Sequence, residues 1–502
     1  MIKKRFVKFT LLVFGFALVF CVRLFMLQKS SHPNGLDGYF YALQAKSFAE
    51  TGRLENPSHE IGYYICGAFA FVTKNPILGV KIWAAASSAL VSLAIFFVVF
   101  ALAKKFSLSF AGFFLSAVSP TFSVMGINFI NNQTGILFLL LYVALLLQVA
   151  QQIHGSQHKI RLILRILLCV MLFALSAVSH KVSFVFAILA TFLFAIHFVL
   201  ILLKKCSNQK VLLVVKIAFA VIFGTVGIFL VYFFRRQSPR FMNAFSLPFV
   251  NLKNCAQLLN YVGFAGVIEI GFYALALYAF AIFKREFLPA VLVLALYFPF
   301  WNLGQDMASR MLLNAVPLGL PLFLWFLNDF FAGKLSRSAV KKLIFTVSGL
   351  SFILLFFTPN LYNPKKDPPY SYYRRVVKNI ELDDDCLLIA HLGLNHVYTY
   401  YKGLKDALNW LPDFYMPLEK TWRIAYGVDS ERIKSVFGKN EFAGFIDDLV
   451  QQIDSRYVLI REDLWQAYLA REESEISETL KNWFNPHEVR PNFIRRKKIS
   501  RG

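Results

Sequence analysis

The sequence predicts a mainly α-helical protein, a polytopic transmembrane bundle of about eleven spans followed by a small α/β domain outside the membrane. Two observations predict the bundle. Of the 502 residues, 57% are hydrophobic and only 16% are charged, whereas about a quarter of an average soluble domain is charged. The apolar residues also gather in runs of about 20, the length at which a helix crosses a bilayer. A change to a charged composition after about residue 359 predicts the separate domain.

Eleven apolar segments meet the length criterion to within a few residues. They lie at residues 8–27, 79–103, 108–126, 133–151, 163–179, 182–203, 211–234, 257–283, 286–301, 310–331 and 341–358. The first segment follows the basic start "MIKKRFVK" and precedes no small-residue cleavage site. This favours an uncleaved first span over a removed secretory signal.

Basic loops orient the bundle. Six basic segments occupy alternate loops when the N-terminus is placed inside, and Lys and Arg collect in cytoplasmic loops. We therefore expect a multi-pass protein of the cell (inner or cytoplasmic) membrane with a cytoplasmic N-terminus. The segment "RRQSPR" (Arg235–Arg240) is an exception, because it falls on the outer side. The basic loops also explain the formal net charge of +24, so no nucleic-acid partner is expected.

This orientation divides the chain in two. Residues 1–358 form the transmembrane domain, whose first outer loop covers 28–78, and residues 359–502 form an extracytoplasmic domain. The runs "CLLIAHL" and "RYVLI" are strand-like and helical stretches lie between them, which predicts a mixed α/β fold. The C-terminal "IRRKKISRG" is expected to be a solvated basic tail.

The first outer loop holds an unusual set of polar residues. A helix that starts at Asp37 places Asp37, Tyr41 and Gln44 on one face and ends near Gly52. The following "EIGYYICGAFAFV" is too short to span and predicts an interfacial helix. Asp37 has two compatible interpretations: a helix N-cap, or a carboxylate that takes a proton from an attacking hydroxyl. A helix N-terminus favours the ionised form that a base needs.

The order of these segments resembles a known family. A basic N-terminal span precedes an outer loop reading "LDGYFYALQAKSFAETGRL", a short apolar helix and a long second span. This is similar to the GT-C superfamily of integral-membrane glycosyltransferases, which holds the protein O-mannosyltransferases and the aminoarabinose transferases of lipid A. The resemblance covers roughly residues 8–360 and implies a sugar donor linked to polyprenyl phosphate. Asp37 matches the family's first-loop aspartate, which serves as base or orients the acceptor. A second acidic residue is common after the third span, where this chain reads "NFINNQTG".

Cations are expected to hold the donor phosphate, and Arg does so best through its planar fork. Arg310 opens the tenth span in "SRMLLNAVPL", which looks like a late-span arginine pattern of the family. Its alternative is a helix pair with Asp306, four residues earlier. Lys181 lies between the fifth and sixth spans, where family members often carry a basic residue, and its alternative is a simple turn. Arg235 and Arg236 of "RRQSPR" are further candidates.

Other polar side chains are expected to contact the sugar or the acceptor: Tyr41, Gln44, His59, Glu60 and Asp306. The set His32, Asp37, His59 and Glu60 matches no compact metal-binding spacing, so no metal ligand and no certain cofactor is assigned. An oxygen-rich site for a divalent cation stays open. Glu269, near the middle of the eighth span, is expected to be protonated or to pair with another span.

The predicted function is transfer of a sugar, a hexose or a pentose, from a polyprenyl-phosphate donor to an extracytoplasmic lipid, glycan or protein, with Asp37 as general base. The expected partners are the donor, the membrane lipids and the acceptor. Two alternatives stay open, a transporter or flippase and a polymerase or ligase of lipid-linked glycans. A transporter should show interrupted helices and several mid-membrane charges. A polymerase or ligase should have its large polar loop late in the chain, whereas here the long polar loop is the first.

Overall fold

The computed structural model describes residues 2–35, 37–153, 159–205, 266–269, 271, 273, 305–332, 336–363, 370–379, 387–388, 392–402, 457–461 and 494–498. Contacts within the chain divide it into two compact units. The bundle unit comprises Met1–Lys29, Ser58–Ile65 and Lys81–Tyr362, and the loop–tail unit comprises Ser30–Pro57, Cys66–Val80 and Asn363–Gly502. The domain limits of 1–358 and 359–502 stay a prediction. The compact units differ from these limits because most of the first loop groups with the tail.

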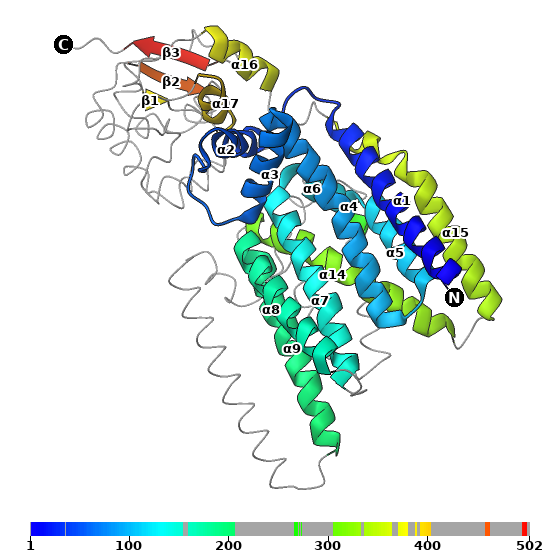
Figure 1. Ribbon diagram of the computed structural model, residues 1–502. Helices are drawn as coiled ribbons and strands as arrows, with labels where there is room; N and C mark the ends of the chain where they lie inside the picture. The colour runs from blue at the N-terminus through cyan, green and yellow to red at the C-terminus, as the bar shows by residue number, and fades with distance from the viewer. Residues whose placement is uncertain are drawn as a thin grey trace. The chain divides into compact units, whose positions relative to one another are not determined.

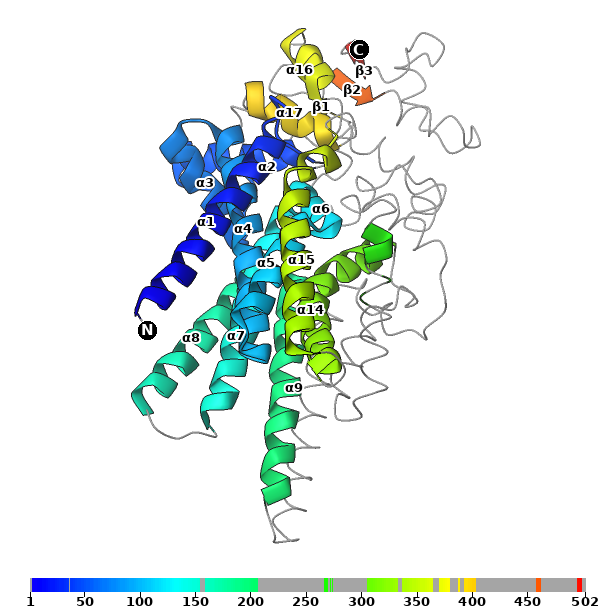
Figure 2. The same ribbon diagram turned by 90° about the vertical axis from the view of Figure 1, so that its right-hand side faces the viewer.

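Helices make up most of the described residues (Figures 1 and 2). The bundle unit contains α1 (Ile2–Leu27), α5 (Phe106–Val118), α6 (Pro120–Asn128), α7 (Ile130–Ile153), α8 (Lys159–Ser179), α9 (Lys181–Lys205), α14 (Gln305–Ala332), α15 (Arg337–Leu355) and the short 3₁₀ helix η2 (Thr358–Leu361). Helices α3 (Ile61–Thr73) and α4 (Pro76–Ala103) have residues in both units. Helix α7 packs against α8 and α9, and α5 packs against α14 and α15.

By length and composition, five helices among the described residues are suited to crossing a membrane. They are Phe6–Leu27, Pro76–Ala103, Ile130–Gln152, Ile160–Ser179 and Ser338–Leu355. Each coincides with a segment that the sequence predicts as a span. The predicted spans at 211–234 and 286–301, and most of the one at 257–283, lie outside the described residues.

One predicted span, 108–126, is not a single helix. It breaks into α5 and α6, which meet at Ser119 with a bend of 56°. The cause is Pro120, because proline disfavours a helical conformation in the residue before it. Ser119 accordingly has an extended backbone, with φ −60° and ψ 127°. If the bent pair counts as one span, the described residues hold six candidates.

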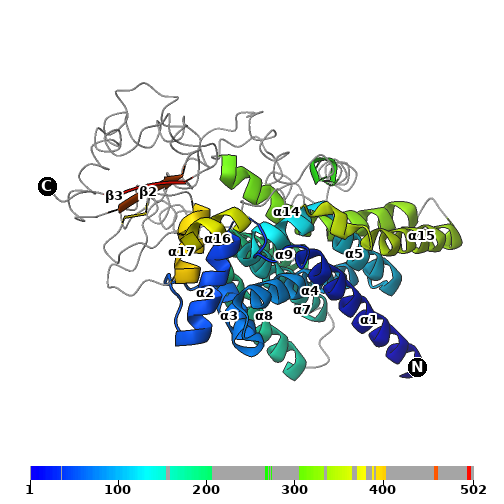
Figure 3. The same ribbon diagram turned by 90° about the horizontal axis from the view of Figure 1, so that it is seen from above.

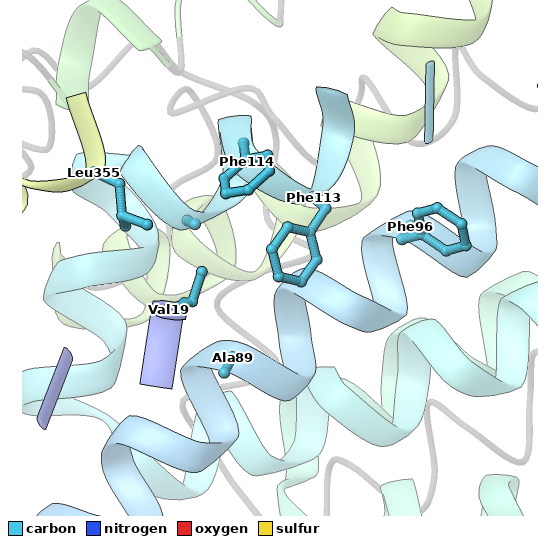
Figure 4. Close-up of a cluster of buried hydrophobic side chains, with 7 residues drawn as sticks. Val19, Ala89, Phe96, Phe113, Phe114 and Leu355 are labelled. Carbon is cyan, nitrogen blue, oxygen red and sulfur yellow. The ribbon is translucent and has the colours of Figure 1, made fainter. Parts of the chain in front are cut away.

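The core of the bundle unit joins four helices (Figure 4). Its buried side chains come from α1, α4, α5 and α15: Val19, Ala89, Phe96, Phe113, Phe114, Ala117 and Leu355. Close packing of this kind holds helices together in lipid, where apolar burial alone gives no preference for the protein interior. Helix α8 has the opposite character. Many of its apolar side chains are exposed, for example Leu164 at 60% and Val170 at 63%, as expected of a surface that faces lipid.

The loop–tail unit contains α2 (Gly38–Thr51), α16 (Tyr370–Asn379), α17 (Leu392–Lys402) and a three-stranded sheet. Helix α17 packs against both α2 and α16, and the three helices lie together in the view from above (Figure 3). Strand β2 (Tyr457–Arg461) pairs in parallel with β1 (Leu387–Leu388) and antiparallel with β3 (Ile494–Lys498). Strands β1 and β2 fall in the two strand-like runs of the sequence. Strand β3 corrects the expectation of a solvated basic tail, because the "IRRKK" backbone is paired with β2.

Candidate functional site

The bend between α5 and α6 receives a buried arginine from α1. Arg23 is 2% exposed. Its Nη2 donates to the carbonyl oxygen of Ala117 at 2.6 Å, and its Nη1 donates to Ser123 Oγ at 2.6 Å. The break leaves carbonyl groups at the end of α5 without their helical partners, and such groups must find a donor inside a membrane protein. Arg23 supplies that donor.

The carboxyl group of Glu269 binds the residues at the start of α6, on the other side of the same break. Glu269 accepts hydrogen bonds from Ser119 Oγ at 2.9 Å, from Thr121 Oγ at 2.8 Å and from the Thr121 backbone N–H at 3.3 Å. Ser119 also caps α6, because its Oγ accepts from the Phe122 backbone N–H at 3.2 Å. The expectation that Glu269 pairs with another span is confirmed, since Ser119 and Thr121 belong to the predicted span 108–126.

The first turn of α7 forms a buried polar cluster. It contains Asn131, Asn132, Gln133 and Thr134, all of which are buried. Two of them bond to α4: Gln133 Nε2 donates to Ser88 Oγ at 2.6 Å, and Thr134 Oγ accepts from Trp83 Nε1 at 3.0 Å. Asn131 Nδ2 donates to the carboxyl group of Glu60. The "NFINNQTG" segment, which has no acidic residue of its own, is therefore in contact with one from the first loop.

Glu60 contacts Asn131 and is influenced by the charges of two other predicted site residues, His59 and Lys181. Burial raises the pKa of its carboxyl group, while hydrogen bonds from Asn131 and Tyr63 and the charges of His59 and Lys181 act in the opposite direction. Glu60 is half-buried, and His59 and Lys181 are exposed. The structure thus brings together a carboxyl group, an imidazole and an ammonium group from residues 59, 60 and 181. We call Glu60, Asn131, His59 and Lys181 the Glu60 cluster.

Asp37 belongs to the loop–tail unit and occupies the N-cap position of α2, as the sequence predicts. Its backbone carbonyl accepts from the Tyr41 N–H at 3.1 Å, which starts the helix. Its carboxylate makes no capping hydrogen bond. The helix ends at Gly52, which has φ 73° and donates its N–H to the Phe48 carbonyl at 2.9 Å. The predicted bounds of α2 are confirmed, whereas the side chain of Asp37 does not serve as the cap.

Tyr41 and Gln44, the other two residues of the predicted face, are both buried. Gln44 is committed to its own loop: its Nε2 donates to the Asn56 carbonyl and its Oε1 accepts from the Asn56 N–H, each at 3.2 Å. This pair of bonds fixes the chain after α2. The contacts of Tyr41 and Gln44 with a sugar stay a prediction.

A hydrogen-bonded chain of aromatic side chains ties α2 to the tail. The ring of His32 is hydrogen-bonded through Nδ1 to Tyr39 Oη at 2.8 Å and through Nε2 to Ser371 Oγ at 3.0 Å. Tyr39 Oη is also 2.9 Å from Tyr401 Oη. Burial raises the pKa of Tyr39, so its hydroxyl stays neutral. Since both nitrogens of His32 are engaged within the protein, this histidine does not fit the role of a metal ligand.

For the remaining predicted site residues the structure gives at most the helix to which they belong. Asp306 and Arg310 lie near the start of α14. Arg235 and Arg236 lie outside the described residues. Within the part of the chain that the structure describes, no three His, Cys, Asp or Glu side chains are grouped as a metal site requires.

Sequence reasoning missed Arg23 and Asn131. Arg23 could have been found from the sequence, because an ionisable residue within an apolar span such as "FCVRLFML" usually has a functional or structural role. Asn131 could not have been found in this way, since its role is the hydrogen bond to Glu60, which lies 71 residues away in the sequence.

No protein-family model matches this sequence, and no curated protein sequence matches it. Solved structures do. The crystal structure of ArnT from Cupriavidus metallidurans bound to undecaprenyl phosphate is similar with a TM-score of 0.54 and 12% identity, over 97% of this chain and 97% of that chain. The Archaeoglobus fulgidus oligosaccharyltransferase tethered to an acceptor peptide is similar with a TM-score of 0.54 and 13% identity, over 96% of this chain and 72% of that chain.

A further crystal structure of the archaeal oligosaccharyltransferase, in complex with Zn and sulfate, is similar with a TM-score of 0.52 and 12% identity, over 91% of this chain and 69% of that chain. Together with the apolar helices, these similarities make the chain a multi-pass membrane protein. They confirm the resemblance seen in the sequence at the level of architecture: this chain has the fold of the GT-C membrane glycosyltransferases.

Proposed function

We propose that this chain is a membrane glycosyltransferase that moves a hexose or pentose from a polyprenyl-phosphate donor to an extracytoplasmic lipid, glycan or protein. The observation that carries the proposal is a fold similarity over 97% of both chains with a protein crystallised with undecaprenyl phosphate. The solved oligosaccharyltransferase, which is tethered to an acceptor peptide, supports an enzyme that also binds an acceptor.

Asp37 is the general base of the proposed reaction. The acceptor hydroxyl oxygen forms a bond to the anomeric carbon, the bond from this carbon to the phosphate oxygen breaks, and the hydroxyl proton passes to Asp37. One feature supports this role. The position of Asp37 at the N-terminus of α2 favours the ionised form of its carboxyl group, because the helix dipole is positive there.

Cations hold the phosphate that leaves with the polyprenyl chain. We assign this role to Lys181, Arg310, Arg235 and Arg236. Lys181 is the best supported of the four, because it is exposed and belongs to the Glu60 cluster. Contacts with the sugar or the acceptor are assigned to Tyr41, Gln44, His59, Glu60 and Asp306. No step of the mechanism is assigned to a metal.

The proposed arrangement in the cell follows the basic loops of the sequence. About eleven spans place the protein in the inner (cytoplasmic) membrane with its N-terminus in the cytoplasm. The α/β tail domain then lies outside, on the same side as the first loop. The acceptor is reached on that side.

The substitution Asp37→Asn tests the proposal. Asn is nearly isosteric with Asp and caps helices about as well, so the protein should fold and reach the membrane. The transfer rate should fall by about 10²–10⁴-fold, because Asn cannot take up the acceptor proton. The assay follows conversion of a defined acceptor by purified protein in lipid. Normal transfer by Asp37→Asn would refute the role of Asp37 as base.

The two alternative functions are separated by a second readout. A transporter or flippase moves the lipid-linked glycan without consuming it, whereas the proposed enzyme releases free polyprenyl phosphate. A polymerase or ligase releases a polyprenyl pyrophosphate instead. Mass spectrometry of the lipid product therefore distinguishes all three.

A further inference from the structure

One cation of the loop–tail unit, Arg374 in α16, is stacked on an aromatic ring and lacks an acceptor for its donors. Its guanidinium carbon lies 5.2 Å from the centre of the Tyr401 ring in α17. Its Nε is buried, and within the described part of the chain it has no hydrogen-bond partner. Buried donors in proteins usually have a partner, so this one indicates a water molecule or a ligand at the guanidinium group.

Tyrosine rings from α2 and α17 form a platform beside Arg374. The rings of Tyr400 and Tyr401 lie 5.0 Å apart and nearly perpendicular, and Tyr39 of α2 lies 5.3 Å from Tyr400. Burial raises the pKa of both Tyr39 and Tyr400, and the charge of Arg374 acts on both in the opposite direction. Side chains of three helices of one unit, which lie together in Figure 3, therefore converge on this place.

The second cation at this platform shows by contrast what Arg374 lacks. Lys46 of α2 lies 5.3 Å from the centre of the Tyr400 ring, and its Nζ donates to the Tyr400 carbonyl at 2.7 Å. Its charge also acts on a neighbouring carboxyl group, that of Glu55. Among the described residues, neither an acceptor nor a carboxyl group pairs with the guanidinium of Arg374. Lys46 is therefore committed to the protein, and Arg374 is available to a ligand.

The surroundings of Arg374 can be reached from solvent and are positively charged. Arg374, Tyr400 and Tyr401 are half-buried, so a ligand can touch all three. Helices α16 and α17 contain no acidic residue, and they carry four cations: Arg374, Arg375, Lys378 and Lys402. A guanidinium group that is stacked on a ring keeps its N–H groups directed outward in one plane, and this fork matches a carboxylate or a phosphate.

We propose that Arg374, stacked on Tyr401, binds a carboxylate or phosphate group of the acceptor, which is therefore an anionic carbohydrate. The flat apolar faces of Tyr400 and Tyr401 suit the sugar that carries this group, because tyrosine combines an apolar ring with a polar tip. The inference rests on the proposed function, in which the loop–tail unit lies on the side where the acceptor is reached. It names the chemical class of that acceptor.

The test measures binding of soluble probes to the full-length protein in nanodiscs of neutral phosphatidylcholine. The probes are maltotriose, maltotriose that carries one phosphate, and trigalacturonate, which carries carboxylates. The parent should bind at least one anionic probe more tightly than maltotriose. Arg374→Gln should weaken that probe by about tenfold or more, the effect of a lost charge-assisted hydrogen bond, and leave maltotriose unchanged. Arg374→Lys keeps the charge and loses the fork, so its loss should be smaller.

Arg375→Gln is the matched control, because it removes the same charge from the next residue of α16, which is exposed. It should weaken the anionic probe by less than about twofold, since an exposed charge contributes little. Equal losses in Arg374→Gln and Arg375→Gln would show attraction by net charge alone and would overturn the site. A parent that prefers no anionic probe would overturn it as well.

Polyprenyl phosphate without a sugar separates the acceptor from the donor. Arg374→Gln should bind this lipid as tightly as the parent does, which also shows that the variant is folded. If Arg374→Gln weakened the lipid as much as the anionic probe, the acceptor role would be refuted. Failure of the parent itself to bind polyprenyl phosphate would instead refute the proposed function, and the acceptor role with it, whatever the soluble probes show.

Discussion

Ser119 should be among the most sensitive positions of the bundle unit, because its hydroxyl group serves both sides of the α5–α6 break. It accepts from the Phe122 N–H at 3.2 Å as the cap of α6 and donates to Glu269 at 2.9 Å. The side chain is 2% exposed, so water cannot replace either partner. Ser119→Ala removes both bonds at once.

The expected cost follows from these two bonds. Loss of an N-cap serine costs about 1 kcal/mol, and loss of a buried hydrogen bond to a carboxyl group costs about 1–3 kcal/mol. Ser119→Ala should therefore lower the free energy of unfolding by about 2–4 kcal/mol. Ser119→Thr keeps the hydroxyl group and should recover most of this loss.

The assay is reversible unfolding of the purified protein by SDS in mixed micelles. Ser116→Ala is the control, since Ser116 is buried at 1% exposure three residues earlier and its Oγ only donates to the Phe113 carbonyl at 2.8 Å. It should cost no more than about 1 kcal/mol. If Ser119→Ala costs no more than Ser116→Ala, the break is not held by Ser119 and the reasoning fails.

The remaining predictions concern donor binding, pH and topology. Arg310→Ala should reduce use of the lipid phosphate donor far more than Arg310→Lys, because Lys keeps the charge and loses only the fork; steady-state kinetics within about twofold of the parent for both would contradict a phosphate contact. Burial raises the pKa of Glu60 above its ordinary 4.5, so the folded state binds this proton more tightly than the unfolded state. The parent should therefore lose stability as pH rises through that raised pKa, while Glu60→Gln, which keeps an acceptor for Asn131, should not; equal pH slopes in unfolding experiments would contradict this. Cysteine probes at Ser31 and Ser371 should react with an impermeant reagent in intact cells, and reaction only after permeabilisation would reverse the topology.

The sequence was sufficient for features that depend on neighbouring residues. The end of α2 follows from Gly52, which takes the left-handed conformation that ends a helix, and α2 starts at the predicted Asp37 although the Asp37 side chain makes no capping hydrogen bond. The five span candidates follow from length and composition, because a helix in lipid satisfies its own backbone and needs only an apolar surface. Pro120 was also a local signal, and the break at Ser119 could have been predicted from it.

Only the tertiary structure decided which polar groups meet. Glu60 is held by Asn131, Arg23 by Ser123, and Glu269 by Ser119, pairs that lie 71, 100 and 150 residues apart. Nothing near one member of such a pair in the sequence indicates the other. A hydrogen bond requires two atoms within about 3 Å, and only the packing of the helices brings these side chains so close.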